Sequence, residues 1–448
     1  MIEILQIIIQ LLIFNTLFLF PITPYFASKL LKNFNINYFS IVAFNIIIQL
    51  FIYLIISFYN LNLTNIYFCF LLFSLIFLVI NFKYNFQFFL NNCNKLLLSF
   101  LIINLSLFFV ICSNPALGWD GAVHWINKAQ MYFQGLGFMK TGIKEYPHLP
   151  GFIWGYFWKN SIIQKEYIGR LFLIFFYLTS IFYATNLFNN YIKDNLRIIF
   201  CFIVVFLSYD QSLFGGYNDY FIFSLFILSS IFLYNVILNV DKKSYSLYLL
   251  LFYISSFLLP WTKQEGFFWF ILLILVLVFI QDSLEKKLLH LFNLSLLVGV
   301  FFSAKFFLHE SISFAYQSLN LKILIPLVTS IEILRVFIDI SYYIMVSFLK
   351  YPIWILILIT FLIIGFDKNN KKLYRHFYLF LFFNIIFLYA LMFHAYLVKS
   401  SLNEISTFYL VLRVSLDRIV LQSSGFYLVL MILVLNKKIF KKKLEIFN

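Results

Sequence analysis

Long apolar runs, separated by short polar interruptions, recur along the chain from its first residues to near its end. A helix that crosses the hydrocarbon core of a bilayer needs about 20 mostly apolar residues, so runs of this length predict membrane-spanning helices. Of the 448 residues, 63% are hydrophobic and 11% are charged, whereas about 25% of the residues of a soluble domain are charged. This composition excludes a soluble enzyme and a disordered chain. It also excludes a nucleic-acid-binding domain, because the basic residues behind the net charge of +15 are dispersed between the apolar runs.

The apolar runs predict an all-α polytopic membrane protein with about thirteen transmembrane helices. The runs lie at 2–25, 38–59, 66–82, 96–112, 167–187, 198–209, 220–240, 245–261, 266–280, 289–308, 341–366, 377–397 and 419–436. Three parts follow: N-terminal transmembrane helices over 1–112, an outer-face loop with interfacial helices over 113–166, and a helix bundle with short loops and a basic tail over 167–448.

The basic residues predict the orientation, because Lys and Arg gather in the cytoplasmic loops of membrane proteins. If the basic loops all face the cytoplasm, the N-terminus lies outside and the C-terminus lies inside. Residues 326–366 then cross the membrane once, with 326–340 along the outer surface. The loops concerned contain Lys29, Lys83, Lys193, Lys242, Lys286, Lys368 and Lys437. The residue bias of an AT-rich genome and the lack of eukaryotic sorting signals favour a bacterial inner membrane.

The loop over 113–166 is the longest stretch without a full span, and connections of this length are usually functional or disordered. Its content of Trp, Tyr, Phe and Pro argues against disorder. A helix break before Trp119 places Asp120 just past a membrane exit. Residues 122–133, which include His124, have the spacing of an amphipathic surface helix.

The second half of this loop combines ionisable and aromatic residues. Glu145, Tyr146 and His148 lie in a Pro-containing turn, and the aromatic run 152–158 follows. This run is too short to span a bilayer, and we expect a helix that lies in the outer leaflet or dips into it. An aromatic belt that only anchors the loop is the simpler interpretation, but it gives no reason for Glu145 and His148 to lie beside the aromatic residues.

Three further short motifs come before later spans on the same predicted face. Ionisable side chains at the hydrocarbon boundary are costly unless they face a cavity or a partner, so we expect these motifs to converge on an outer-face cavity. The motifs are Gly215-Gly216-Tyr217-Asn218-Asp219, Thr262-Lys263-Gln264-Glu265-Gly266 and Ser415-Leu416-Asp417-Arg418.

The Trp119-Asp120 motif at the start of the long loop makes four motifs with these three. Their order resembles the type-C glycosyltransferase superfamily, whose members include protein O-mannosyltransferases and the bacterial aminoarabinose transferases of lipid A. The resemblance covers about 96–436 as short motifs rather than continuous similarity. It implies a type-C fold and an enzyme of the cell envelope. That enzyme would move a sugar from a polyprenyl-phosphate donor to a hydroxyl group of a glycan, lipid or protein acceptor.

Sugar transfer from a lipid phosphate requires a base and positive charge. Asp120 is the expected general base, which takes the proton of the acceptor hydroxyl. Lys263 and Arg418 are expected to stabilise the departing phosphate, because cations bind its oxygens and Arg does so with two parallel hydrogen bonds. The other predicted substrate-binding residues are Trp119, His124, Glu145, Tyr146, His148, Asp219 and Glu265.

The chain departs from the family pattern in two ways. The acidic loop follows the fourth predicted span rather than the first, and no second acid stands next to Asp120, so the metal-binding Asp-x-Asp form is missing. No cofactor is therefore certain, and a divalent metal stays open. A polysaccharide polymerase or O-antigen ligase is an alternative within enzymes. A large outer loop late in the chain would favour it, whereas the longest predicted outer loop here is early. A lipid-linked-sugar flippase or transporter is the alternative from another class, although the sequence shows no internal repeat.

Overall fold

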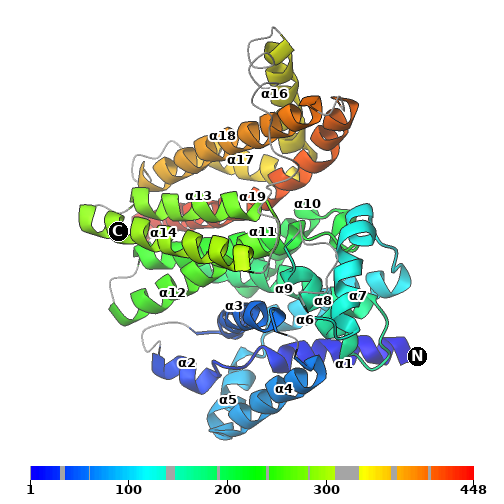
Figure 1. Ribbon diagram of the computed structural model, residues 1–448. Coiled ribbons are helices and arrows are strands. Elements are labelled where there is room, and N and C mark those ends of the chain that lie inside the picture. The colour runs from blue at the N-terminus through cyan, green and yellow to red at the C-terminus, as the bar shows by residue number, and fades with distance from the viewer. Residues whose placement is uncertain are drawn as a thin grey trace. The chain divides into compact units, whose positions relative to one another are not determined.

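The computed structural model describes residues 2–30, 36–59, 61–137, 147–188, 192–238, 242–280, 283–307, 332–364, 371–401 and 405–447 (Figure 1). Every regular element in these ranges is a helix, which confirms the all-α prediction. The chain divides into two compact units, unit 1 over Met1–Lys263 and unit 2 over Gln264–Asn448. The three-part division drawn along the sequence stays a prediction.

Unit 1 is built around α9, whose residues are all buried. This helix is apolar on every side, as a helix in the interior of a bundle must be, and it contacts α3, α6, α8 and α11. The helices of unit 1 are α1 (Ile2–Leu17), α2 (Pro24–Leu30), α3 (Tyr38–Ser57), α4 (Leu63–Val79), α5 (Phe82–Asn92), α6 (Lys95–Ser113), α7 (Ile126–Phe133), α8 (Leu149–Lys159), α9 (Tyr167–Ala184), α10 (Asp194–Ser208), α11 (Asp219–Leu238) and α12 (Lys242–Leu258).

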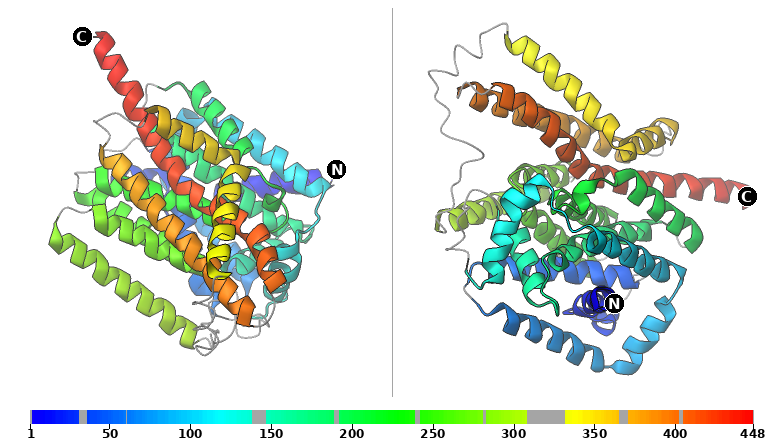
Figure 2. Two further views of the ribbon diagram at one scale, coloured as in Figure 1. Left: turned by 90° about the horizontal axis from the view of Figure 1, so that it is seen from above. Right: turned by 90° about the vertical axis from the view of Figure 1, so that its right-hand side faces the viewer.

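In unit 2 the long helix α19 packs against α16, α17 and α18. The helices of this unit are α13 (Gly266–Ile280), α14 (Leu284–Phe307), α16 (Glu332–Lys350), α17 (Pro352–Ile364), α18 (Lys371–Ser401) and α19 (Ile405–Phe447). α16 and α17 meet at a bend of 89° (Figure 2). The predicted span over 341–366 is therefore not one continuous straight helix, and whether the bent pair crosses the membrane once stays a prediction. The break precedes Pro352, because a proline cannot donate the next helical hydrogen bond but can begin a new helix.

Seven helices in the described ranges are long and apolar enough to cross a bilayer, or up to nine if each of two bent pairs is one span. The predicted count of thirteen is therefore wrong. Three of the predicted spans are shorter apolar helices, Ile2–Leu17, Tyr245–Trp261 and Gly266–Phe279. A hydropathy pattern shows that a run is apolar, but it does not show where the helix breaks. The second bent pair is α4 and α5, which meet at an angle of 93°. Helix α5 lies in the sequence after the predicted span 66–82, where a loop was expected.

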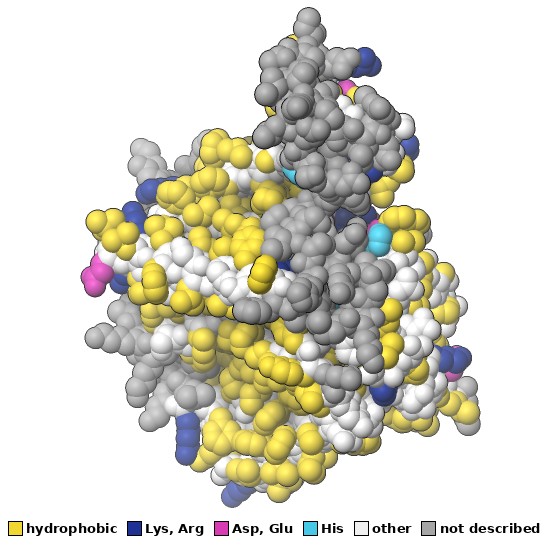
Figure 3. Space-filling view, in the orientation of Figure 1, with side chains coloured by type: hydrophobic (Ala, Val, Ile, Leu, Met, Phe, Trp, Pro, Cys, Tyr) yellow, Lys and Arg dark blue, Asp and Glu magenta, His cyan; other side chains and the backbone are white. Residues whose placement is uncertain are grey.

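Apolar side chains are also exposed over much of the described part of the face seen in Figure 3. On α4, the exposed fractions of Phe68, Leu72, Phe73 and Ile76 are 60%, 57%, 48% and 44%. An apolar helix face of this size is unfavourable in water and suits the hydrocarbon of a bilayer. Together with the candidate spans, it identifies the chain as an integral, multi-pass membrane protein.

Two contacts in unit 1 each join helix ends that the predicted topology places on the same face of the membrane. At one end the turn after α3 meets the long loop, where Ser57 Oγ lies 2.7 Å from His148 Nε2. At the other end the turn before α3 meets the end of α9, where Asn186 Nδ2 donates to Asn37 Oδ1 over 2.8 Å. Which of these two ends faces the cytoplasm stays a prediction.

Candidate functional site

Two segments far apart in the sequence are joined by main-chain contacts, and we call residues 115–121 and 213–219 the paired loops. The backbone N–H of Gly118 donates to the carbonyl oxygen of Gly215 over 2.9 Å. The next N–H, that of Trp119, donates to the hydroxyl oxygen of Tyr217 over 3.0 Å. The structure thus brings the Trp-Asp motif into contact with the Gly-Gly-Tyr-Asn-Asp motif.

Glycine makes this close approach feasible. A side-chain carbon at Gly118 would overlap the ring of Tyr217, and one at Gly121 would overlap the carbonyl oxygen of Gly215. Gly216 has a φ of 77°, in the left-handed region that glycine adopts without strain. The glycines therefore allow two backbones to lie against each other next to Asp120.

Asp120 and Trp119 point to different environments. Asp120 is 8% exposed, whereas Trp119 is 66% exposed and its ring lies 5.2 Å from that of the half-buried His124. Asp120 directly precedes a short π-helical segment, Gly121–Trp125, that leads into α7. The predicted base is thus shielded from solvent, and the predicted aromatic contact is open to it.

Arg170 in α9 holds the paired loops, and the sequence analysis did not select it. Its Nη2 donates to the carbonyl oxygen of Pro115 over 2.6 Å and to Glu166 Oε2 over 3.0 Å. Its Nη1 donates to the carbonyl oxygens of Ala116, over 3.3 Å, and of Phe214. The side chain is fully buried. One guanidinium group therefore fixes both loops to the central helix, a task for which its fork of five N–H donors is suited.

A signal for Arg170 was present in the sequence. It is the one charged residue in the predicted span 167–187 and one of only six arginines. An ionisable residue inside a predicted span marks a functional position by default.

Glu166 and Trp154 complete the surroundings of this arginine. The guanidinium carbon lies 5.7 Å from the ring centroid of Trp154, within range of a cation–π contact. The indole N–H of Trp154 donates to the carbonyl oxygen of Glu166 over 3.2 Å. Burial raises the pKa of the Glu166 carboxyl above its ordinary value of 4.5, although the charge of Arg170 acts in the opposite direction. The anchor of the paired loops therefore contains a titratable group.

A buried ion pair connects the paired loops to the third motif. Lys263 Nζ lies 2.9 Å from Asp219 Oδ1, and the two residues are 7% and 0% exposed. Asp219 begins α11, where the positive end of the helix dipole favours a carboxylate. Lys263 follows the single turn Leu259–Trp261 at the end of α12. Two residues predicted to bind substrate are thus brought together.

His148 reaches the same motif from the long loop. Its ring is fully buried and lies 4.9 Å from the ring of Phe58 and 5.7 Å from that of Trp261. Its position inside the protein suits the packing of the loop against α3 and α12 more than direct contact with a substrate. The following helix, α8, also differs from expectation, because its aromatic residues from Phe152 to Phe157 are buried against protein rather than exposed in the outer leaflet.

Asn218 stands between Tyr217 and Asp219 and was not selected from the sequence. Its residue is 1% exposed, and neither Oδ1 nor Nδ2 of its side chain has a hydrogen-bond partner within the part of the chain that the structure describes. A buried polar group without a partner costs about 1–3 kcal/mol. The amide is therefore a position at which a ligand that both donates and accepts would be stabilised.

The remaining predicted site residues lie outside the described residues or in the other unit. Glu145 and Tyr146 lie outside the described residues. Glu265 and Arg418 belong to unit 2. Arg418 is 9% exposed and donates from Nε to the carbonyl oxygen of Val414 over 3.3 Å.

The expectation that Asp417 and Arg418 precede the last span is wrong. Both lie inside α19, within the candidate span Ser406–Asn436. The helix continues through this position because the Asp417 carboxylate has partners there. It forms an ion pair with Lys350, and Ser347 Oγ donates a hydrogen bond to it over 2.6 Å.

A metal site is not assembled from the described residues, since no three His, Cys, Asp or Glu side chains among them gather around one point. Comparisons with known proteins give no family for this chain. No family model matches it, and neither does any curated protein or solved structure.

Proposed function

We propose that this chain is a membrane glycosyltransferase that moves a sugar from a polyprenyl-phosphate donor to an acceptor hydroxyl, with Asp120 as the general base. The observation that carries the proposal is the contact between the paired loops, which holds Asp120 on the same protein core as Asp219 and Lys263. The order of the sequence motifs supports the same chemistry. The donor sugar and the acceptor are left open.

Asp120 suits the role of base because it is shielded from solvent, whereas the neighbouring Trp119 is exposed. Its carboxylate lies within the protein at 8% exposure and would take the proton of the attacking hydroxyl as the new bond forms. The new bond forms between the acceptor oxygen and the anomeric carbon, and the bond from that carbon to the phosphate oxygen breaks. The exposed ring of Trp119 offers an apolar face beside this carboxylate.

Lys263 suits the role of the cation that meets the departing phosphate. An ammonium group is a compact positive charge with three N–H donors, and Lys263 Nζ donates to Asp219 Oδ1 over 2.9 Å. Asp219 compensates the charge of the buried lysine, because a buried cation without a partner is strongly disfavoured. The amide of Asn218, next to this pair in sequence, would bind a sugar hydroxyl, which can both donate and accept.

The decisive experiment compares Asp120→Asn with Asp210→Asn in membranes supplied with a panel of labelled polyprenyl-phosphate hexoses and pentoses. Asp210 lies in the 209–219 loop and accepts a hydrogen bond from its own loop, since Ser212 N donates to its Oδ1 over 3.4 Å. We expect Asp120→Asn to reduce transfer by about 10²–10⁴-fold, the usual contribution of general base catalysis. Asp210→Asn should retain it. Normal transfer by Asp120→Asn at equal expression would refute the assignment of the base.

One observation in unit 2 favours a second candidate, a transporter or flippase of lipid-linked sugars. Helices α16 and α17 form a sharply bent pair, and Lys350 at the bend pairs with Asp417 from inside a candidate span. Broken helices with ionisable residues at membrane depth are typical of transporters. Reconstituted vesicles distinguish the two candidates. A transporter moves a fluorescent polyprenyl-phosphate sugar across the bilayer intact, whereas a transferase cleaves it from its carrier.

A further inference from the structure

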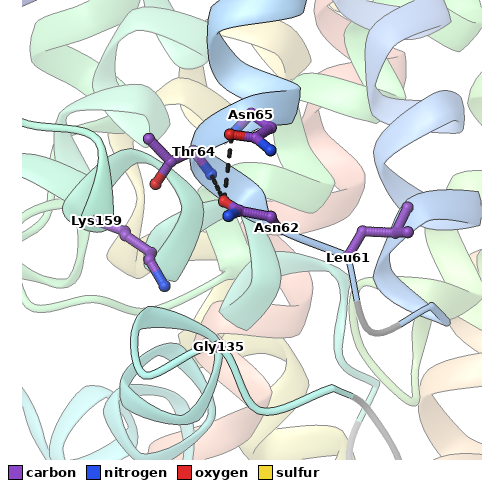
Figure 4. A pocket seen from close by; sticks show the side chains of 6 residues that line it. All are labelled: Leu61, Asn62, Thr64, Asn65, Gly135 and Lys159. Carbon is purple, nitrogen blue, oxygen red and sulfur yellow. Dashed lines mark hydrogen bonds between the residues drawn. The ribbon is translucent and has the colours of Figure 1, made fainter.

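A polar hollow lies at the end of unit 1 where the turn before α4 meets the ends of α7 and α8 (Figure 4). Its volume is about 570 Å³, within the range of roughly 300–1,000 Å³ that small-molecule sites occupy. The described residues that line it are Leu61, Asn62, Thr64, Asn65, Gly135 and Lys159. The paired loops contribute no residue to this lining, so the hollow is separate from the proposed catalytic site.

The lining offers hydrogen-bond donors and one positive charge. Asn62 Oδ1 accepts from the backbone N–H groups of Thr64 and Asn65, at 3.0 Å and 3.3 Å, so this oxygen is occupied in capping α4. Within the part of the chain that the structure describes, the amide N–H groups of Asn62 and Asn65 and the hydroxyl of Thr64 remain available. The positive end of the α4 dipole adds to the charge of Lys159. Among the described residues of the lining there is no carboxylate to neutralise this charge.

The composition of the lining distinguishes between ligand classes. A site that holds a sugar ring usually presents an aromatic face, and none of the described lining residues is aromatic. A cation would be repelled by Lys159. Phosphate oxygens, by contrast, accept hydrogen bonds from ammonium, amide and hydroxyl donors, and charged acceptors make the stronger bonds.

The position of the hollow fits a ligand at the membrane boundary. Trp158, next to Lys159, stacks on Phe133 with ring centroids 4.4 Å apart, and its indole N–H donates to the carbonyl oxygen of Gln164 over 2.7 Å. Trp side chains with one apolar and one hydrogen-bonded edge gather at the level of the lipid headgroups. We propose that this hollow binds a phosphate-bearing group, held by Lys159 and by the side chains of Asn62, Thr64 and Asn65.

Lys159 also lies in the last turn of α8, where a cation stabilises the negative end of the helix dipole. That role needs only a positive charge near the helix end, whereas the proposed site also needs the α4 side chains. Substitutions on α4 therefore separate the two roles.

The test uses the purified full chain and native mass spectrometry with three probes: phosphatidylglycerol, glycerol 1-phosphate, and a monoglucosyl diacylglycerol that has acyl chains but no phosphate. We expect Lys159→Gln to weaken phosphatidylglycerol binding about tenfold, equivalent to about 1.4 kcal/mol. Asn65→Leu should weaken it in the same direction, and Lys159→Arg should retain it. The matched control is Lys83→Gln, which removes an exposed charge from α5 of the same unit.

The probes identify the source of the phosphate. Binding of glycerol 1-phosphate with the same dependence on Lys159 indicates a soluble phosphate compound. Binding of phosphatidylglycerol alone indicates a lipid headgroup. The proposal is overturned if Lys159→Gln weakens binding no more than Lys83→Gln, or if the glucosyl lipid loses as much affinity as phosphatidylglycerol. It is also overturned if Asn65→Leu and Thr64→Val both leave phosphatidylglycerol binding unchanged.

Discussion

Lys263 and Asp219, 44 residues apart in sequence, form an ion pair of 2.9 Å that is almost closed to solvent. Removing one partner of a buried pair leaves the other charge without compensation, which costs about 3–5 kcal/mol. We expect Lys263→Met to lower the unfolding temperature in detergent strongly. The double variant Lys263→Met with Asp219→Leu should recover most of the loss, because it removes both charges.

Lys83→Met serves as the control for this pair, since it replaces an exposed lysine of the same unit. Equal destabilisation by the single and the double variant would mean that the pair contributes packing rather than charge compensation.

Arg170 fixes the paired loops through their backbone carbonyl groups. Its substitution should therefore loosen these loops without unfolding the rest of the unit. We expect Arg170→Lys to reduce sugar transfer at least tenfold, because an ammonium group has three donors and no planar fork. Hydrogen exchange of the N–H groups of Gly118 and Trp119 should become faster in this variant, while the exchange of α11 changes little. Arg197→Lys is the matched control, because Arg197 lies outside the paired loops and donates to the carbonyl oxygen of Phe188. Unchanged exchange at Gly118 would contradict the anchoring role.

Substitution by alanine should change the stability in opposite directions at Gly121 and Gly299. Gly121→Ala would place a methyl group against the carbonyl oxygen of Gly215, so the paired loops must move apart. A methyl group at Gly299 in α14 meets nothing within 4 Å. There alanine should stabilise the helix by about 0.5–1 kcal/mol. Thermal unfolding of both variants tests this, and a Gly121→Ala protein as stable and active as the parent would show that the loops do not depend on the close approach.

Much of this architecture could be predicted from the sequence, because apolar runs of membrane length have few alternatives to helices. Where each helix ends could not, because Pro352 and the bend after α4 act locally and leave the average hydropathy unchanged. The motif residues Asp120, Asp219 and Lys263 stand out by charge at the end of an apolar run. The roles of Arg170 and Asn218 follow only from the contacts in the structure. The residues next to Arg170 in sequence do not show which carbonyl groups it binds, and those next to Asn218 do not show that its amide has no partner among the described residues.

The raised pKa of Glu166 predicts a pH dependence of stability. Burial favours the protonated carboxyl in the folded state, so between pH 4.5 and the folded pKa the folded chain holds more protons than the unfolded chain. The free energy of unfolding therefore decreases as the pH rises through this window, and the contribution is fully present below pH 4.5. The unfolding temperature, measured from about pH 4 to about pH 7, should fall less steeply in Glu166→Gln than in the parent. An identical slope in both proteins would contradict the assignment.

Asn218 gives the most selective test of the proposed site, because stability and binding should change in opposite directions. Its buried amide has no partner among the described residues, so Asn218→Leu should stabilise the ligand-free protein by about 1–3 kcal/mol. The same change should raise the KM for the polyprenyl-phosphate sugar about tenfold, because the sugar hydroxyl loses a bond worth about 1.4 kcal/mol.

Asn104→Leu is the control for this prediction. Asn104 is also buried, but its Nδ2 already donates to the carbonyl oxygen of Phe100 over 2.9 Å, so this substitution should leave the KM unchanged. A more stable Asn218→Leu protein with an unchanged KM would mean that the amide does not contact the substrate, and a less stable one would mean that its present surroundings already compensate it.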